Sequence, residues 1–204
     1  MIVPIQQDSE LATDFAQADN VTGALHVWWL GHSGFLLKWN GKGILIDPYL
    51  SDSLNRRFGH KDPSLQRMTQ QLIDPLFVNG IDFVLASHNQ MSHLDPETIL
   101  PLRSSNPLMK MVLPAGIENV VEKELGKAAP GMLTLNEGTY VKHNGIEIHG
   151  IKAANPEAEF DENGNSKNLG FLIIAGPFSI YFSGDTVWHD SLVRDIRRWP
   201  VNLA

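Results

Sequence analysis

The sequence predicts one α/β domain, in the α+β manner, in which mostly antiparallel sheets carry helices on their outer faces. Three observations predict this fold class. Short apolar, β-branched runs recur along the chain between glycine and proline turns. A few other segments space their apolar residues every three to four positions, as amphipathic helices do. Finally, a chain of 204 residues with an apolar share of 43% can bury one substantial core.

The first part of the chain is predicted to be an N-terminal extension followed by three short strands. Residues 1–23 are mixed and end in the turn sequence NVTG. The NGKG sequence at 40–43 is typical of a β-hairpin turn. Asp47 and Pro48 then end the third strand. We expect the strands at residues 25–30, 34–39 and 43–47.

The middle of the chain is predicted to alternate helices with buried strands. Residues 51–62 are polar and irregular, whereas 63–78 has the apolar spacing of a helix. Asp95 is a candidate N-cap, since proline follows it at the first helical position. A further helix is expected over 117–125, with Gly126 as a plausible C-cap. Buried strands are expected at 81–87 and 108–116.

The last third of the chain is denser in strands. The sequence HNG at 143–145 predicts a hairpin, and Gly176-Pro177 joins two further strands. Residues 188–199 form an amphipathic helical pattern. The final residues, PVNLA, resemble the start of another strand. We found no repeat or linker, so the whole chain 1–204 is predicted to be a single domain.

Composition excludes several classes of function. The net charge is −7 and no basic cluster exceeds a pair, so nucleic-acid binding is not expected. With no cysteine, disulfides, cysteine nucleophiles and thiolate zinc sites are excluded. The N-terminus lacks the features of a signal peptide, and no apolar run approaches transmembrane length. We therefore expect a cytoplasmic protein without a transmembrane segment.

Three loops that follow predicted strands carry residues able to bind a metal or move a proton. The first contains His32, the second is ASHNQMSHLD at 86–95, and the third contains Asp185 and His189. Loops at strand ends commonly hold functional groups on a rigid scaffold. Structural alternatives stand beside each candidate. His88 could cap a strand end, Asp185 could cap its turn, and for Asp95 the helix-capping role is favoured.

The remaining polar and aromatic candidates are expected to be structural. His32 is interpreted as a packed or supporting residue, His189 as a residue of a helix surface, and Asp47 as structural. The tryptophans are interpreted as core and rim residues, one of which could line a substrate cleft. These are Trp28, Trp29 and Trp39.

Five motifs in order carry a resemblance to a known superfamily. They are HVWWLGHSGFLL, GILIDPYLSDS, SHNQMSHLD, NLGF and YFSGDTVWHD. Together they resemble the metallo-β-lactamase superfamily, and more closely its branch with the L-ascorbate-6-phosphate lactonases and N-acyl phosphatidylethanolamine phospholipase D. The resemblance covers residue 25 to the end. It implies an αββα sandwich, from which this chain would lack the C-terminal strand and helix. It also implies an activity, the hydrolysis of a small phosphoester or lactone.

The resemblance also implies a ligand set for two metal ions. The loop pattern His-x-His-x-Asp-His places His88 at its first histidine and His93 at its last. Asp185 matches the aspartate that bridges the two ions, which makes His88 and Asp185 the candidate catalytic residues. The family's C-terminal histidine has no counterpart before Ala204.

Three further ligand positions depart from the family pattern. Gln90 stands where the second histidine is expected, Ser92 where the aspartate is expected, and Asn155 where a later histidine is expected. Neutral amides and a hydroxyl are weak ligands for zinc or manganese, the metals of the relatives. Weak or absent metal binding and impaired dinuclear catalysis are therefore expected.

Two alternatives to a working enzyme stay open. One is a non-catalytic relative that binds a small ligand or a protein. The other is a fragment that needs a partner, since a missing last strand would expose a sheet edge. A homo-oligomer could cover that edge.

Overall fold

The structure is a computed structural model that describes residues 1–59, 61–62, 66–126 and 130–204. Contacts group the chain into two compact units. The first unit comprises Met1–Ala86, Gln90–Met111 and Glu124–Gly131, and the second comprises Ser87–Asn89, Val112–Lys123 and Met132–Ala204. Among the described residues, no helix has the length and apolar character needed to cross a bilayer.

One sheet has the strand order β1-β2-β3-β4-β5-β6, and its strands are β1 (Leu25–Trp29), β2 (Phe35–Trp39), β3 (Lys42–Ile46), β4 (Phe83–Leu85), β5 (Lys110–Pro114) and β6 (Gly131–Leu135). The predicted hairpin joins β2 to β3. Its turn residues Asn40 and Gly41 both have positive φ, as a tight hairpin turn requires. β3 pairs with β4 in parallel, and both strands are apolar and buried, as expected for a parallel pair.

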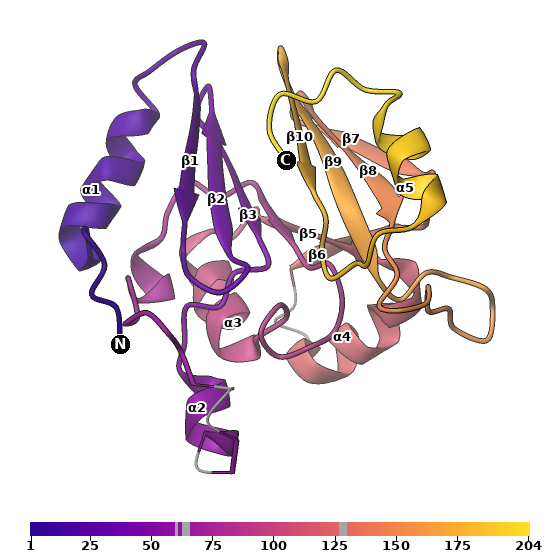
Figure 1. Cartoon of the computed structure of the whole chain (residues 1–204). Helices are drawn as coiled ribbons and strands as arrows, with labels where there is room; N and C mark the ends of the chain where they lie inside the picture. Colours follow the sequence, from indigo (N-terminus) through magenta and orange to yellow (C-terminus); the bar gives the residue numbers. More distant parts are fainter. Residues whose placement is uncertain (60, 63–65, 127–129) are drawn as a thin grey trace. The chain divides into compact units, whose positions relative to one another are not determined.

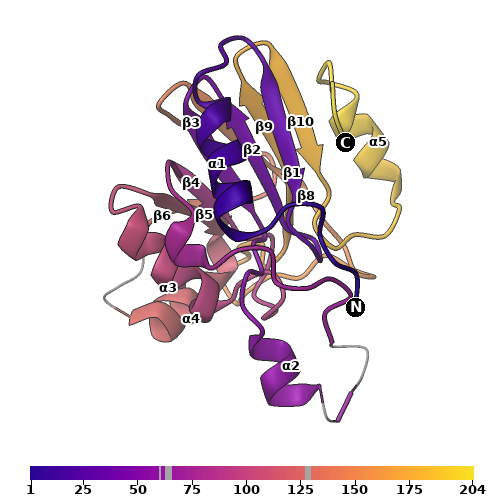
Figure 2. The ribbon, with the colours of Figure 1, turned by 90° about the vertical axis from the view of Figure 1, so that its left-hand side faces the viewer.

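Helix α1 (Asp8–Ala18) packs along one side of the β1–β2–β3 strands in the first unit (Figures 1 and 2). No helix was predicted within the N-terminal extension. Its buried residues Leu11, Phe15 and Ala18 are spaced four and three apart, which places them on one helical face. The ring of Phe15 meets Trp28 edge-on at 5.1 Å. The apolar stripe explains why α1 forms against the sheet.

The helix predicted over 63–78 is wrong for the residues described there. Residues 63–65 lie outside the described part, and the rest contains only the 3-10 turn η2 (Pro75–Phe77). Thr69 instead forms a parallel bridge with Ile2 of the N-terminal arm. A short helix, α2 (Ser53–Phe58), lies where irregular structure was expected. Tertiary contacts therefore overrode the apolar spacing of this segment.

The two other helices predicted in the middle of the chain are confirmed. Helix α3 (Pro96–Ser105) begins at Asp95, whose side chain accepts a hydrogen bond from the Glu97 backbone N–H. Helix α4 (Glu118–Leu125) follows the 3-10 turn η3 (Ala115–Ile117).

The second sheet lies wholly in the second unit, in the order β10-β9-β8-β7. Its strands are β7 (Tyr140–His143), β8 (Ile146–Lys152), β9 (Leu169–Ala175) and β10 (Phe178–Phe182). All neighbours are antiparallel, and the predicted turns at Asn144-Gly145 and Gly176-Pro177 are confirmed. Helix α5 (Asp190–Ile196) lies beside these strands (Figure 1). The last residues return to the sheet, where Leu203 forms a bridge with Ile180.

Candidate functional site

The loop after β4 contains two histidines, one in each compact unit. His88 belongs to the second unit and His93 to the first. Both side chains are buried, although they stand in a polar loop. Buried imidazoles need polar partners, and each has a carboxylate partner within its own unit. Each pair is the candidate functional group of its own unit.

In the first unit, His93 is held by two oxygen atoms. Its Nδ1 lies 2.7 Å from Asp47 Oδ2 and 3.1 Å from Ser33 Oγ. Both members of the His93–Asp47 pair are nearly inaccessible, with side-chain exposures of 6% and 0%. A carboxylate on one ring nitrogen fixes the orientation of the imidazole and raises the basicity of the other nitrogen. Nε2 is thus the atom through which His93 would bind a metal ion.

Asp47 was interpreted as structural, and its contact with His93 was not predicted. Its backbone has a φ of +42°, which is uncommon for a residue other than glycine. The Asp47 N–H donates to the Leu85 carbonyl at the end of β4, at 2.8 Å. The available signal was an aspartate directly after a buried strand, in the GILIDPYLSDS motif.

In the second unit, His88 lies near Asp185. The His88 Nε2 to Asp185 Oδ2 distance is 3.8 Å, while Nδ1 is 2.9 Å from Ser87 Oγ. The Asp185 side chain is 40% exposed. The structure therefore brings together the two residues predicted to be catalytic, in a looser contact than that of His93 with Asp47.

The three positions that depart from the family pattern differ in their surroundings. Gln90 is exposed, and its backbone carbonyl accepts hydrogen bonds from the His93 and Leu94 N–H groups in a turn. Ser92 is partly buried, and Asn155 is exposed. The structure thus uses the Gln90 backbone to shape the loop that leads to His93.

Asp95 closes the same loop and acts as a structural residue. Its two carboxylate oxygens accept hydrogen bonds from Ser53 Oγ at 3.0 Å and Thr98 Oγ1 at 2.6 Å. It is completely buried. The predicted helix-capping role is confirmed.

Two further histidines were candidates from the sequence. His32 has a φ of +48° and meets the Tyr49 ring edge-on at 4.8 Å. Burial, followed by the charges of Arg67 and His93, lowers the pKa of His32, so its imidazole is neutral at pH 7. His189 was predicted to lie on a helix surface. It is the partly buried N-cap residue of α5 instead, with Nδ1 2.9 Å from Ser191 Oγ.

Comparison with known proteins establishes the class of this protein. Residues 26–197 match the family model described as the beta-lactamase superfamily domain. The chain belongs to this superfamily, and its fold is the metallo-β-lactamase fold.

Two curated relatives are similar to this chain in sequence. The chain is 25% identical to a UPF0173 metal-dependent hydrolase from Saccharolobus solfataricus, over 78% of this chain and 60% of the relative. It is also 25% identical to N-acyl-phosphatidylethanolamine-hydrolyzing phospholipase D 1 from Caenorhabditis elegans, over 97% of this chain and 58% of that protein. The chain thus spans about 60% of the length of the curated relatives it matches.

Solved structures agree on the fold. An isothiocyanate hydrolase from Delia radicum gut bacteria aligns with a TM-score of 0.63 at 18% identity, covering 87% of this chain and 69% of that one. CmlA, a diiron beta-hydroxylase from Streptomyces venezuelae, aligns with a TM-score of 0.63 at 15% identity, covering 90% and 34%. Because these sequence identities are low, the alignments show a shared fold and nothing about function.

Proposed function

We propose that this chain is a metal-dependent hydrolase relative with a reduced metal site, which binds one divalent cation weakly and has weak or no dinuclear catalysis. His88, His93 and Asp185 would be the remaining ligands, and zinc or manganese the ion. The observation that carries the proposal is the donor chemistry at Gln90 and Asn155, since both side chains are neutral amides exposed to solvent. Such groups bind dications poorly compared with imidazole and carboxylate.

The residues that remain suit one ion better than two. His93 is pre-oriented through Asp47, which is the arrangement found behind many metal-binding histidines. Asp185 lies beside His88, and a cation could draw its partly exposed carboxylate closer. A bound zinc or manganese ion would supply Lewis acidity and lower the pKa of a coordinated water. The chain's own contribution is to hold the imidazoles in a fixed orientation.

The substrate class comes to this chain only through its relatives. The relatives that this chain matches include a phospholipase D and metal-dependent hydrolases. We infer that any activity here acts on a small phosphoester or lactone.

Metal content and turnover test the proposal together. Purified protein is measured by elemental analysis and assayed on a phosphodiester and a lactone, with zinc or manganese added. We expect at most about one ion per chain and little turnover. About two ions per chain with turnover would contradict the reduced site.

A restoring variant sharpens the test. Replacing Gln90→His, Ser92→Asp and Asn155→His returns strong donors to the three positions, and we expect metal affinity to rise at least 10–100-fold, the scale of ligand-environment effects. The matched control is Asn89→His, which adds an imidazole to an exposed neighbour in the same loop. An equal gain in the control would show that the three positions are misassigned.

A further inference from the structure

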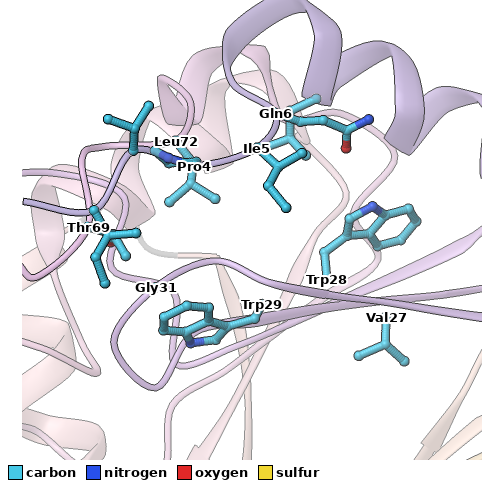
Figure 3. A pocket seen from close by; sticks show the side chains of 12 residues that line it. Pro4, Ile5, Gln6, Val27, Trp28, Trp29, Gly31, Thr69 and Leu72 are labelled. Carbon is cyan, nitrogen blue, oxygen red and sulfur yellow. The ribbon is translucent and has the colours of Figure 1, made fainter.

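The two units contain pockets of different chemistry. Figure 3 shows the groove of the first unit, which Trp28 and Trp29 help to line, and none of the described residues that line it is charged. A pocket of about 230 Å³ lies in the second unit, and we call it the arginine pocket. Its lining comes from the turn after β6, from β8, and from α5 with the residues that follow it. The lining residues with polar or aromatic side chains include Glu137, His149, Arg194, Asp195, Arg198 and Trp199.

Two arginine side chains of the arginine pocket are held by one aspartate. Arg194 Nε and Arg198 Nη2 each lie 3.3 Å from Asp195 Oδ1. The Asp195 side chain is 15% exposed, whereas those of Arg194 and Arg198 are 69% and 66% exposed. Because a guanidinium has five N–H donors, each arginine keeps donors for a further partner. Two guanidinium groups around one carboxylate also leave one positive charge in excess, which a bound anion would compensate.

The arginine pocket has an aromatic side as well. The Trp199 and His149 rings are in contact, with centroids 4.5 Å apart and planes tilted by 54°. His149 is held by Glu147, since its Nε2 lies 2.7 Å from Glu147 Oε1, and it stacks on Tyr140 at 5.0 Å. Trp199 is partly buried and packs against an apolar cluster of α5 and the sheet, made of Ile151, Leu172, Tyr181 and Leu192. Both rings are therefore held in place by the protein itself.

These features select the chemistry of a ligand. The pocket volume is below the range of sites for drug-sized molecules, so the ligand must be small. Neighbouring guanidinium groups suit a phosphate, whose several terminal oxygens can accept hydrogen bonds from both arginines at once. Glu137 would repel an anion, which favours placing the phosphate beside α5. A fixed indole ring favours a flat aromatic group in the rest of the ligand.

We propose that the arginine pocket binds a small aromatic phosphate monoester. The phosphate oxygens accept hydrogen bonds from the Arg194 and Arg198 guanidinium groups, and the aromatic ring of the ligand lies against Trp199. Such charge-assisted bonds are about twice as strong as those between neutral groups. The site uses none of the proposed metal ligands, and binding requires no metal ion.

Binding of phenyl phosphate to metal-free protein tests the proposal. The full chain is treated with a chelator, dialysed to remove the chelator, and titrated at low ionic strength with phenyl phosphate, inorganic phosphate and phenol. We expect calorimetry to show phenyl phosphate binding at least tenfold more tightly than either fragment. Equal binding of phenyl phosphate and either fragment, or no binding up to millimolar concentration, would overturn the proposal. Since no metal is present, this outcome is independent of the metal proposal.

Charge-matched variants locate the phosphate group. Arg194→Gln and Arg198→Gln each remove one guanidinium, and we expect phenyl phosphate to bind about tenfold more weakly to either variant. Thermal stability should change little, because both side chains are exposed. Arg197→Gln removes the same charge from an exposed neighbour outside the described lining and should bind within about twofold of the wild type. Unchanged binding in the first two variants, or equal weakening in all three, would contradict the assigned site.

The indole N–H signals in an NMR titration locate the aromatic ring of the ligand. Phenyl phosphate should shift the Trp199 signal, which Trp199→Phe identifies by its loss. Trp188 of the same unit is 75% exposed and is the control, so its signal should stay in place. A shift of the Trp188 signal without a shift of the Trp199 signal would place the ring outside the arginine pocket and overturn the proposal.

Discussion

The two histidine–aspartate pairs differ in burial and in distance. His93 and Asp47 touch at 2.7 Å, and the aspartate is inaccessible to solvent. His88 and Asp185 are 3.8 Å apart, and the aspartate is 40% exposed. A buried, tight pair is part of the packing of its unit, whereas an exposed, loose pair contributes little to stability. We therefore expect the His93–Asp47 pair to contribute more to the stability of its unit than the His88–Asp185 pair does.

The largest expected effect is on the buried pair. Asp47→Ala leaves the buried His93 imidazole without its carboxylate, so the free energy of unfolding should fall by about 3–5 kcal/mol. Chemical denaturation of metal-free protein measures this change in the free energy of unfolding. Asp185→Ala is the matched change in the loose pair and should cost less than about 1 kcal/mol. Similar losses in the two variants would remove the distinction between the pairs.

Metal binding should depend on the loose pair. At a hundredfold excess over Kd, a cation that binds only the folded protein adds about 2.7 kcal/mol to stability. We expect zinc or manganese to raise the unfolding temperature of the wild type, and His88→Gln to remove most of that gain. His143→Gln, an exposed histidine of the same unit, is the control. A gain that survives in His88→Gln would exclude His88 as a ligand.

A smaller effect is expected at Ser33. Its Oγ lies 3.1 Å from His93 Nδ1, beside the stronger contact with Asp47. Ser33→Ala should therefore lower the free energy of unfolding by about 1 kcal/mol, the usual worth of one hydrogen bond. Ser104→Ala, on an exposed face of α3, should have no measurable effect. A loss as large as that of Asp47→Ala would show that the hydroxyl, rather than the carboxylate, holds His93.

The smallest effect concerns pH in the first unit. Because the pKa of His32 is lowered in the folded protein, the unfolded chain binds the proton more readily. The contribution of His32 is present above its unfolded pKa of about 6.5 and is lost as pH falls toward the folded pKa. His32→Asn suits the positive φ and should lose less stability than the wild type between pH 7.5 and 5. Denaturation midpoints at several pH values test this, and parallel curves would contradict it.

Much of the fold was predictable because its signals are local. The turns at Asn40-Gly41 and Asn144-Gly145 need positive φ, which asparagine and glycine adopt easily. The cap at Asp95 depends on residues within one helical turn. Helix α1 was missed, although Leu11 and Phe15 already gave its spacing. The 66–74 segment was misassigned because its apolar spacing imitates a helix.

The candidate site was predictable only in part. The motifs selected His88, His93 and Asp185, and the structure places His88 beside Asp185 within one unit. Whether these three residues bind a metal stays a prediction. The contact of Asp47 with His93 was not predicted because an aspartate before proline commonly ends a strand. Nothing in the local sequence links Asp47 to a histidine 46 residues later.

The sequence by itself determined the superfamily, the strand-rich order of elements, the turns and the donor types available at each loop, because these depend on residue chemistry and on neighbours a few positions apart. Only the tertiary structure decided that Asp47 holds His93, that Arg67 is buried without a carboxylate at ion-pair distance among the described residues, and that Thr69 packs closely against Gly31. Contacts between residues far apart in the chain form only when the core closes around them, and packing then fixes which polar atoms meet and which stay unsatisfied.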